Sequence, residues 1–336
     1  QRSLVGSEMC IRDRSTMKNL LIFTVTLLIP LCSCSQTENT DTDEPVIPPP
    51  SNNYVLQGSM QGSAELVEAG YTQIHQYMRK IGWDYSEHPN SSSLDHKDGV
   101  HGEVIYDLFI RQYIFKLSIH ANEKALDGDR GKLIDRQRNE MKTQTTPSWY
   151  KLNGNWDEWQ QLKWKFKIPK DFRPSGSFTH LHQLKAQEGN NGSPVITITA
   201  RSNGNGSNRR IQIIHNGDTE ETTKGTIIDN LPLEDFEDEW IQVETEMHYT
   251  HNGSFSITLS RLSDGKRLVQ RSFDDIDLWR KGAISIRNKF GIYRSFGKTL
   301  TDENDRPTNG IKDEHILLAD FKVYEKNTNP DPQPHD

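Results

Sequence analysis

Cysteine is nearly absent from this sequence. The 336-residue chain contains three cysteines, and all of them lie before residue 35. The rest of the chain therefore offers no cysteine for a disulfide, a metal site or a nucleophile. A block of basic residues is also lacking, and the formal net charge is −7. A mildly acidic chain of this kind is a poor candidate for binding nucleic acid, so no such partner is expected.

Long apolar runs are lacking too, apart from Leu20–Leu31, which is too short for a comfortable membrane span. Lys18 precedes this run and small residues follow it, so residues 17–34 are interpreted as a secretion signal. The letters LCSC (31–34) resemble a bacterial lipobox with Cys34 as the lipidated residue. We therefore expect a lipoprotein held at the outer membrane, on the cell surface or in the periplasm. The alternative is an ordinary cleaved signal peptide and a secreted protein.

The composition of the remaining chain divides it into further segments. Residues 1–16 contain SLVGSEMCIRD, which resembles a translated sequencing adapter, so they are interpreted as an artefact preceding Met17. Residues 35–53 are polar, acidic and rich in proline, which is typical of a flexible linker. Residues 54–326 are expected to form one domain, and the polar residues 327–336 a disordered tail.

Alternation of apolar and polar residues dominates the expected domain. QLKWKFKIP (161–169) alternates large apolar residues with lysines, which indicates a half-buried strand. Further strands are predicted at 113–120, 194–200, 210–216, 240–250, 254–262, 267–273 and 316–324. One amphipathic helix is predicted over 61–81. Because no βαβ rhythm and no repeat appear, we expect an all-β sandwich of two antiparallel sheets with a short N-terminal helical segment, as a monomer.

Charged residues share one face of a predicted strand within DRGKLIDRQRNEMKT (129–143). Arg136, Arg138, Glu140 and Lys142 have the same parity there. Such a row can be a solvated face whose ion pairs contribute little to the stability of the fold. It can also be an anion-binding wall, because arginine forks match carboxylates in two-point contact. The charges alone leave both readings open.

The stretch SFTHLHQLKA (177–186) has no face that is apolar throughout. His180 and His182 share one side, while Gln183 and Lys185 share the other. A polar strand in mid-domain suggests a site. Two histidines in a His-x-His pattern can also bind zinc, but zinc needs further ligands and no third one is obvious. No metal site is therefore predicted.

The stretch RNKFGIYRS (287–295) separates two kinds of residue. Phe290 and Ile292 share the parity expected of the core, and Arg287, Lys289 and Tyr293 share the other. Neighbouring cations stabilise a phenolate, which lets a tyrosine act as a base. The alternative is a surface tyrosine that lies beside charged side chains.

Together these stretches supply what β-elimination from a uronic-acid polymer requires. Cations and amides neutralise the uronate carboxylate, a base removes the adjacent proton, and an acid protonates the leaving oxygen. A glycoside hydrolase instead needs two carboxylates at a defined separation. Because Glu140 is the only acid on the charged strand faces of the three motifs, hydrolysis ranks lower.

The same stretches resemble the motifs of jelly-roll alginate lyases of family 7. RQRNEMK is similar to their R-x-E-L-R, HQLK falls where they carry Q-I-H, and NKFGIYRS is similar to Y-F-K-A-G-x-Y-x-Q. Glucuronan lyases and heparin lyase I-type enzymes have similar layouts. The resemblance implies a concanavalin-like jelly roll and a polysaccharide lyase.

The resemblance also implies roles for individual residues. Arg138 and Gln183 would neutralise the carboxylate, and Tyr293 would be the base and also the acid. Lys289 would bind substrate, and Glu140 would orient Arg138.

The role of a histidine is left open by departures from the motifs. Lys185 stands where the alginate enzymes have a catalytic histidine. His182 is a catalytic candidate, but it and His180 have the opposite parity to Gln183 unless a β-bulge intervenes. His120 offers another imidazole.

The remaining substrate-binding candidates are Lys185, His180, His120 and Arg294. Asn288 and Ser295 replace a tyrosine and a glutamine of the alginate pattern, which argues against alginate. We therefore expect cleavage of a glucuronate-type polymer, with no required cofactor and with a structural calcium ion left open. The alternatives are a carbohydrate-binding lipoprotein without activity and a glycoside hydrolase on the same scaffold.

Overall fold

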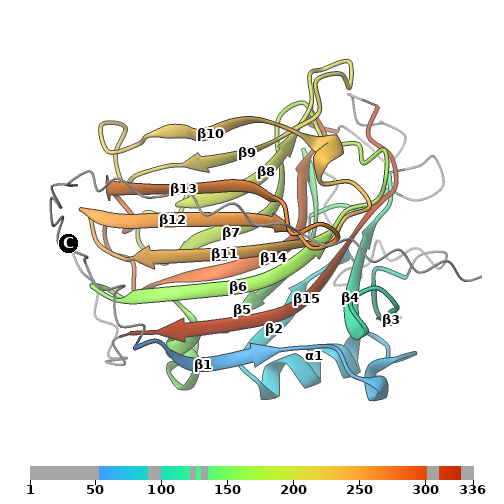
Figure 1. Ribbon diagram of the computed structural model, residues 1–336, viewed down its shortest axis with the longest axis horizontal. Helices are drawn as coiled ribbons and strands as arrows, with labels where there is room; N and C mark the ends of the chain where they lie inside the picture. Colours follow the sequence, from blue (N-terminus) through green and yellow to red (C-terminus); the bar gives the residue numbers. More distant parts are fainter. Residues whose placement is uncertain (1–52, 90–99, 122–125, 130–134, 301–309, 327–336) are drawn as a thin grey trace, which may run out of the picture. The chain divides into compact units, whose positions relative to one another are not determined.

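The computed structural model describes residues 53–89, 100–121, 126–129, 135–300 and 310–326. Within these residues the chain forms two stacked antiparallel β-sheets (Figure 1), which confirms the expected fold class. The expected artefact, signal segment with Cys34, and C-terminal tail lie outside the described residues. No helix in the described ranges is long and apolar enough to cross a membrane.

The first sheet has eight strands in the order β13-β12-β11-β6-β15-β4-β3, with β1 paired to β15. Its strands are β1 (Val55–Met60), β3 (Gly102–Asp107), β4 (Gln112–Ile119), β6 (Trp159–Lys167), β11 (Ile241–His248), β12 (Gly253–Arg261), β13 (Arg267–Ile276) and β15 (Glu314–Glu325). The lysines of β6 alternate with fully buried Leu162, Trp164 and Phe166. The predicted period of two is therefore confirmed.

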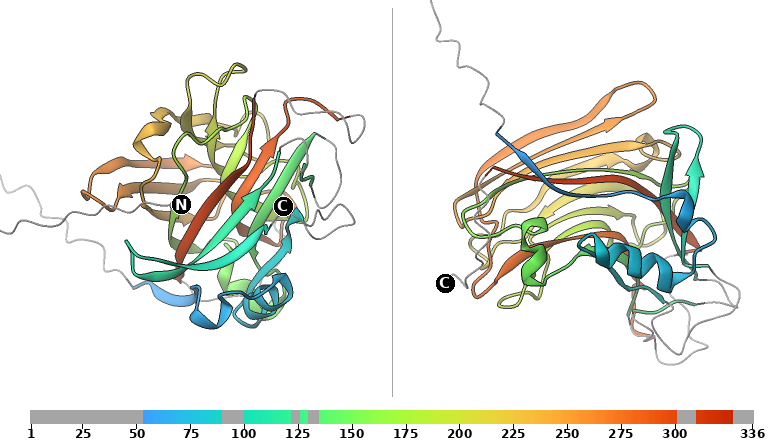
Figure 2. Two further views of the ribbon diagram at one scale, coloured as in Figure 1. Left: turned by 90° about the vertical axis from the view of Figure 1, so that its right-hand side faces the viewer. Right: turned by 90° about the horizontal axis from the view of Figure 1, so that it is seen from below.

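The second sheet has seven strands in the order β10-β9-β8-β7-β14-β5-β2. Its strands are β2 (Trp83–Glu87), β5 (Arg136–Thr143), β7 (Thr179–Gln187), β8 (Ile196–Arg201), β9 (Arg210–His215), β10 (Gly225–Pro232) and β14 (Ser285–Ser295). Figure 2 shows the two sheets edge-on, one above the other.

Aromatic side chains from both sheets meet in the core between them. Phe290 of β14 packs edge-on against Trp164 of β6, with ring centroids 5.0 Å apart, and against Phe321 of β15 at 4.8 Å. All three side chains are fully buried. Burial of each contributes up to about 3 kcal/mol by removing apolar surface from water. This packing fixes which side of β14 faces the core.

The N-terminal helix is shorter than predicted. The helical segments are η1 (Ala64–Leu66), α1 (Tyr71–Lys80), η3 (Pro147–Leu152) and η4 (Leu233–Asp235). The helix predicted over 61–81 is therefore wrong in its first half. Glu68 has a φ of 65° and Gly70 is extended, so the chain cannot run helically through them. The regular helix α1 buries its apolar face through Ile74 and Met78.

Two successive β-bulges offset the middle of the seven-stranded sheet. Between β7 and β8 the register shifts from His180 to His182, and between β14 and β7 it shifts from Phe290 to Tyr293. Gly291 has a φ of 145°, and a Cβ there would lie 2.1 Å from the Asn139 carbonyl oxygen. Only glycine fits this close approach.

Candidate active site

Charged and polar side chains cover the outer face of the seven-stranded sheet around β5, β14 and β7. The register places Arg138 opposite Tyr293, and Tyr293 opposite His180. It also places Lys142 opposite Lys289, and Lys289 opposite Gln183. We call this set the polar face; it comprises Glu87, Arg136, Arg138, Glu140, Lys142, His180, Gln183, Lys185, Lys289 and Tyr293.

Tyr293 is surrounded by cations and one imidazole. Arg136 Nη1 donates a hydrogen bond of 2.7 Å to the Tyr293 hydroxyl. The Arg138 guanidinium lies 3.9 Å from the centre of the Tyr293 ring. The His180 ring lies beside it, with centroids 5.9 Å apart. The Tyr293 hydroxyl therefore accepts a hydrogen bond directly from one cation and has a second cation over its ring.

Glu87 joins three cations of the polar face. Its carboxylate accepts from Arg138 at 2.6 Å, from Lys142 at 2.8 Å and from Lys289 at 2.6 Å. These cations outweigh its burial and hold the pKa of Glu87 well below its usual range. No signal in the sequence pointed to Glu87. Strand alternation places Glu87 on the same side of β2 as the buried Trp83 and Tyr85. It reaches the cations because the register between β2 and β5 shifts after Asp84.

Glu140 lies at the centre of the polar face and is fully buried. Its carboxylate pairs with Lys289 Nζ at 2.8 Å, and Gln183 Nε2 donates a hydrogen bond to its other oxygen. Arg138 Nε lies 3.8 Å from it, while the Arg138 amino groups reach Glu87 and Asp129. The structure thus brings together Arg138 and Gln183, which are predicted to neutralise a uronate carboxylate. Acidic side chains of the protein hold both of them in place.

His180 stands on the polar face because of the bulge in β7. Its Nδ1 lies 2.8 Å from the Thr199 hydroxyl, which donates to Thr197 at 2.7 Å. In this arrangement Nδ1 carries the proton and Nε2 keeps its lone pair. Burial, followed by the charge of Arg201, lowers the pKa of His180 to about 3. His180 is therefore neutral at neutral pH, and its Nε2 can accept a hydrogen bond.

His182 points the other way, into the core. Its ring packs against Trp164 and Phe290 at centroid distances of 5.3 and 4.8 Å, and burial lowers its pKa to about 3. The structure therefore does not bring His182 to Tyr293, as its candidacy would require. The physical reason is the bulge, which leaves His180 and His182 on opposite sides of the sheet.

Arg294 also lies away from the polar face. Its side chain is fully buried, and Nε donates a 2.5 Å hydrogen bond to Gln137 Oε1. Burial lowers its pKa to about 10. Arg294 follows Tyr293 directly, so strand alternation turns it to the inner side. The structure therefore does not bring Arg294 to the polar face, where its contact with substrate was expected.

His120 belongs to a different cluster, behind β5. It follows β4 and lies with His101 and Asp127, on the opposite side from Arg138. The expectation that His120 serves the same site as Tyr293 is therefore not supported by its position. Of the three candidate imidazoles, the structure brings only His180 beside the tyrosine.

Lys185 extends the polar face past Gln183. Its Nζ donates a 2.9 Å hydrogen bond to the Gly192 carbonyl. Burial and the charges of Lys289 and Arg287 lower the pKa of Lys185 to about 8. It therefore loses its charge more readily than an ordinary lysine, and it stands where the resemblance places a histidine.

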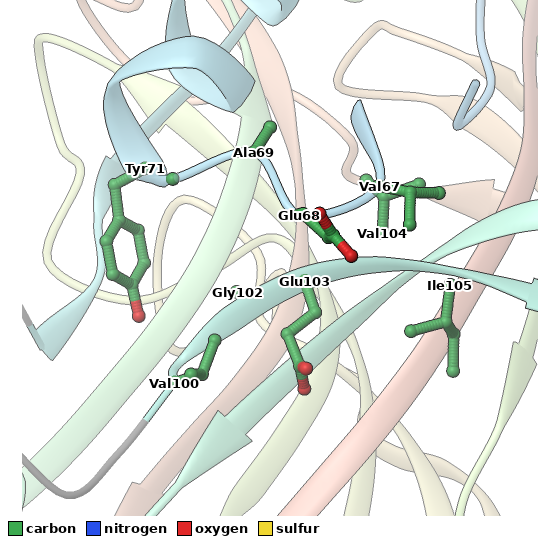
Figure 3. Close-up of a pocket in the computed structure, with 10 residues that line it drawn as sticks. Val67, Glu68, Ala69, Tyr71, Val100, Gly102, Glu103, Val104 and Ile105 are labelled. Atoms are coloured by element: carbon green, nitrogen blue, oxygen red, sulfur yellow. The ribbon is translucent and has the colours of Figure 1, made fainter. Parts of the chain in front are cut away.

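A separate pocket of ≈ 420 Å³ opens between β3 and the segment before α1 (Figure 3). Its lining is mainly apolar, with Val67, Val100, Val104 and Ile105. It contains no residue of the polar face. Its charged lining residues, Glu68 and Glu103, are acids, which disfavours the binding of a uronate there.

Comparison with protein-family models and with curated protein sequences finds no match. Similar solved structures are polysaccharide lyases. An endo-β-1,4-glucuronan lyase from the fungus Trichoderma reesei is 14% identical, with a TM-score of 0.46, covering 84% of this chain and 100% of that one. A marine alginate lyase from Aplysia kurodai is 10% identical, with a TM-score of 0.45, covering 80% and 98%. An alginate lyase from Pseudomonas aeruginosa is 13% identical, with a TM-score of 0.39, covering 68% and 87%. At these identities the likeness is one of fold.

Proposed function

We propose that this protein is a polysaccharide lyase that cleaves a uronic-acid polymer of the glucuronate type by β-elimination. The observation that carries the proposal is the Tyr293 hydroxyl, which accepts a hydrogen bond from Arg136 while Arg138 covers its ring and neutral His180 lies beside it. A proton carrier among cations is suited to a substrate that is itself an anion.

The protein's own part in the proposed reaction is the transfer of one proton. Tyr293 as phenolate takes the proton from C5 of the uronate, the C4–C5 double bond forms, and the bond from C4 to the glycosidic oxygen breaks. The same proton then passes from Tyr293 to the leaving oxygen. Gln183 and the cations of the polar face would neutralise the carboxylate, which makes the C5 proton acidic enough to remove.

His180 is proposed to assist this step through its Nε2 lone pair. Because Thr199 holds Nδ1, the ring orientation is fixed, as a hydrogen-bond acceptor requires. In this proposal Nε2 of the neutral ring accepts a hydrogen bond from the Tyr293 hydroxyl and orients it, while the phenolate forms by release of the Tyr293 proton to solvent. The geometry favours His180 over His182 and His120 for this role.

The acids of the polar face disfavour a glycoside hydrolase. Glu87, Asp129 and Glu140 are all engaged in ion pairs with Arg138 or with lysines, rather than set apart as the facing pair of carboxyl groups that a hydrolase uses. Burial does raise the pKa of Glu158 and Glu325, which share a hydrogen bond. Those two side chains are 3% and 1% exposed, which leaves a polymer little access to them.

The test is digestion of a panel of uronans, including glucuronan and alginate, with absorbance and reducing ends recorded together. Elimination creates a double bond conjugated to the carboxylate, which absorbs ultraviolet light. We expect Tyr293→Phe to lower the rate roughly 10²- to 10⁴-fold. Tyr324→Phe, which alters a tyrosine near a cation on the other sheet, should keep the activity.

Two results would overturn the proposal. Reducing ends without new absorbance would show hydrolysis. Polymer binding without any shortening, unchanged in Tyr293→Phe, would show a carbohydrate-binding protein.

We propose separately that a lipid is attached to Cys34. A mass shift of the expressed protein that is sensitive to globomycin would test this.

A further inference from the structure

Two histidines and one aspartate converge behind β5, outside the polar face. His101 precedes β3, His120 follows β4, and Asp127 lies on the connection toward β5. His101 and Asp127 are almost fully buried, and the His120 side chain is 17% exposed. The three side chains therefore join the eight-stranded sheet to the segment that leads into the seven-stranded sheet.

The spacing of their donor atoms fits a common metal ion. His101 Nε2 lies 2.8 Å from Asp127 Oδ1 and 3.1 Å from His120 Nδ1, and His120 Nδ1 lies 3.3 Å from Asp127 Oδ2. Zinc bonds of about 2.0–2.1 Å in a tetrahedron separate the ligand atoms by about 3.3 Å. A small widening of the two shorter contacts would therefore accommodate the ion.

The contacts among these three side chains place two ring nitrogens against one carboxylate. The two ring nitrogens face each other and also face one carboxylate, so a single proton on His101 Nε2 has to serve both of its neighbours. If both rings instead point N–H groups at Asp127, those groups lie 3.1 Å apart. A divalent cation between the three atoms would use both lone pairs and the carboxylate charge.

We infer that His101, His120 and Asp127 bind a divalent transition-metal ion, with zinc the best-fitting member of that class. Two imidazoles and one carboxylate suit zinc or cobalt, whereas calcium prefers six to eight oxygen ligands. The inference is independent of the proposed lyase activity.

Buried side-chain amides on the inner face of β5 hold the cluster in place. Gln137 Nε2 donates to the carbonyls of His120 and Asp127 at 2.9 and 3.1 Å, and Asn139 Nδ2 donates to the His101 carbonyl at 2.7 Å. Two residues after Asp127, Asp129 binds Arg138 at 2.9 Å. The metal would therefore stabilise the segment that positions Arg138 from behind.

The test uses the tag-free protein after dialysis against a chelator, with Co²⁺ and Zn²⁺ as probes. We expect about one Co²⁺ per chain, with the visible absorption bands of a low-symmetry nitrogen and oxygen site, displacement of these bands by Zn²⁺, and a higher Tm with either ion. His120→Gln and Asp127→Asn should lose the bands. His251→Gln, which alters another histidine 2.9 Å from a carboxylate, should keep them.

Three outcomes would overturn the inference. Wild-type protein that shows no cobalt bands and no metal-dependent Tm would do so. So would bands that persist in both His120→Gln and Asp127→Asn, since the ion would then lie elsewhere. A Tm that rises with Ca²⁺ but not with Zn²⁺, and depends on Asp127, would contradict the class of metal. None of these measurements depends on finding the polysaccharide substrate.

Discussion

The two sides of β5 carry different chemistry. On the outer side, Arg136 and Arg138 are partly exposed and contact Tyr293. On the inner side, Gln137 and Asn139 are fully buried, and their amides bind the backbone carbonyls of His120 and His101, which flank β4 and β3 of the other sheet. Buried polar groups cost free energy unless they are hydrogen-bonded, so the inner residues are fully engaged in holding the scaffold. Charges that remain near water stay available to an anionic substrate.

The largest expected difference between the outer and inner sides of the seven-stranded sheet is in the reaction rate, and it is tested at His180 of β7. Replacing His180 with Gln should lower kcat roughly 10²-fold or more, because the Nε2 acceptor beside Tyr293 is lost. The Tm should fall less than the rate, since the amide of glutamine can donate to the Thr199 hydroxyl in place of Nδ1. The measurement is the initial rate of unsaturated product formation together with a melting curve. Equal rates in His180→Gln and wild type would contradict the proposed role.

His182 provides the matched variant on the inner side. His182→Ala should destabilise the fold by roughly 3 kcal/mol, because a large buried ring is removed from between Trp164 and Phe290. The activity of the remaining folded protein should stay near that of wild type. Urea unfolding and rate measurements below the transition check this. A variant of normal stability that lost its activity would place His182 in the reaction instead.

The smallest effect concerns the pH dependence of stability. Burial raises the pKa of Glu158 and of Glu325 above the ordinary value of 4.5. The folded state therefore binds protons that the unfolded state has released. The stability from this pair is fully present below about pH 4.5 and is lost as the pH rises through the raised values.

Glu325→Gln should therefore flatten the fall of Tm between mildly acidic and mildly alkaline pH. Melting curves recorded across that range compare the variant with wild type. Glu246→Gln, on a more exposed part of the same sheet, is the control and should leave the slope unchanged. A slope that is the same in all three proteins would show that the pair does not control it.

Periodicity predicted the fold and part of the polar face. The alternation in RNKFGIYRS places Lys289 and Tyr293 opposite Phe290, and the structure confirms this because Phe290 is fixed by aromatic packing. Parity failed for β7, where the bulge brings His180 to the side of Gln183. A bulge depends on the register with two neighbouring strands, which local sequence does not encode.

Contacts between distant residues were also beyond the reach of local patterns. His101 and His120 meet because β3 and β4 pair, and Asp127 joins them after the chain turns. Glu87 reaches its three cations from a strand at the sheet edge. The helix predicted over 61–81 failed for a local reason, the backbone at Glu68 and Gly70.

Mass spectrometry of the products from a defined uronan oligosaccharide tests the central claim most directly. Elimination releases a new non-reducing end that lacks the elements of one water molecule, whereas hydrolysis adds water across the bond. We predict that every cleavage by wild-type protein yields a fragment lighter by one water than the hydrolysis product, and that Tyr293→Phe yields almost none. Fragments with the full mass of hydrolysis products would contradict β-elimination at Tyr293.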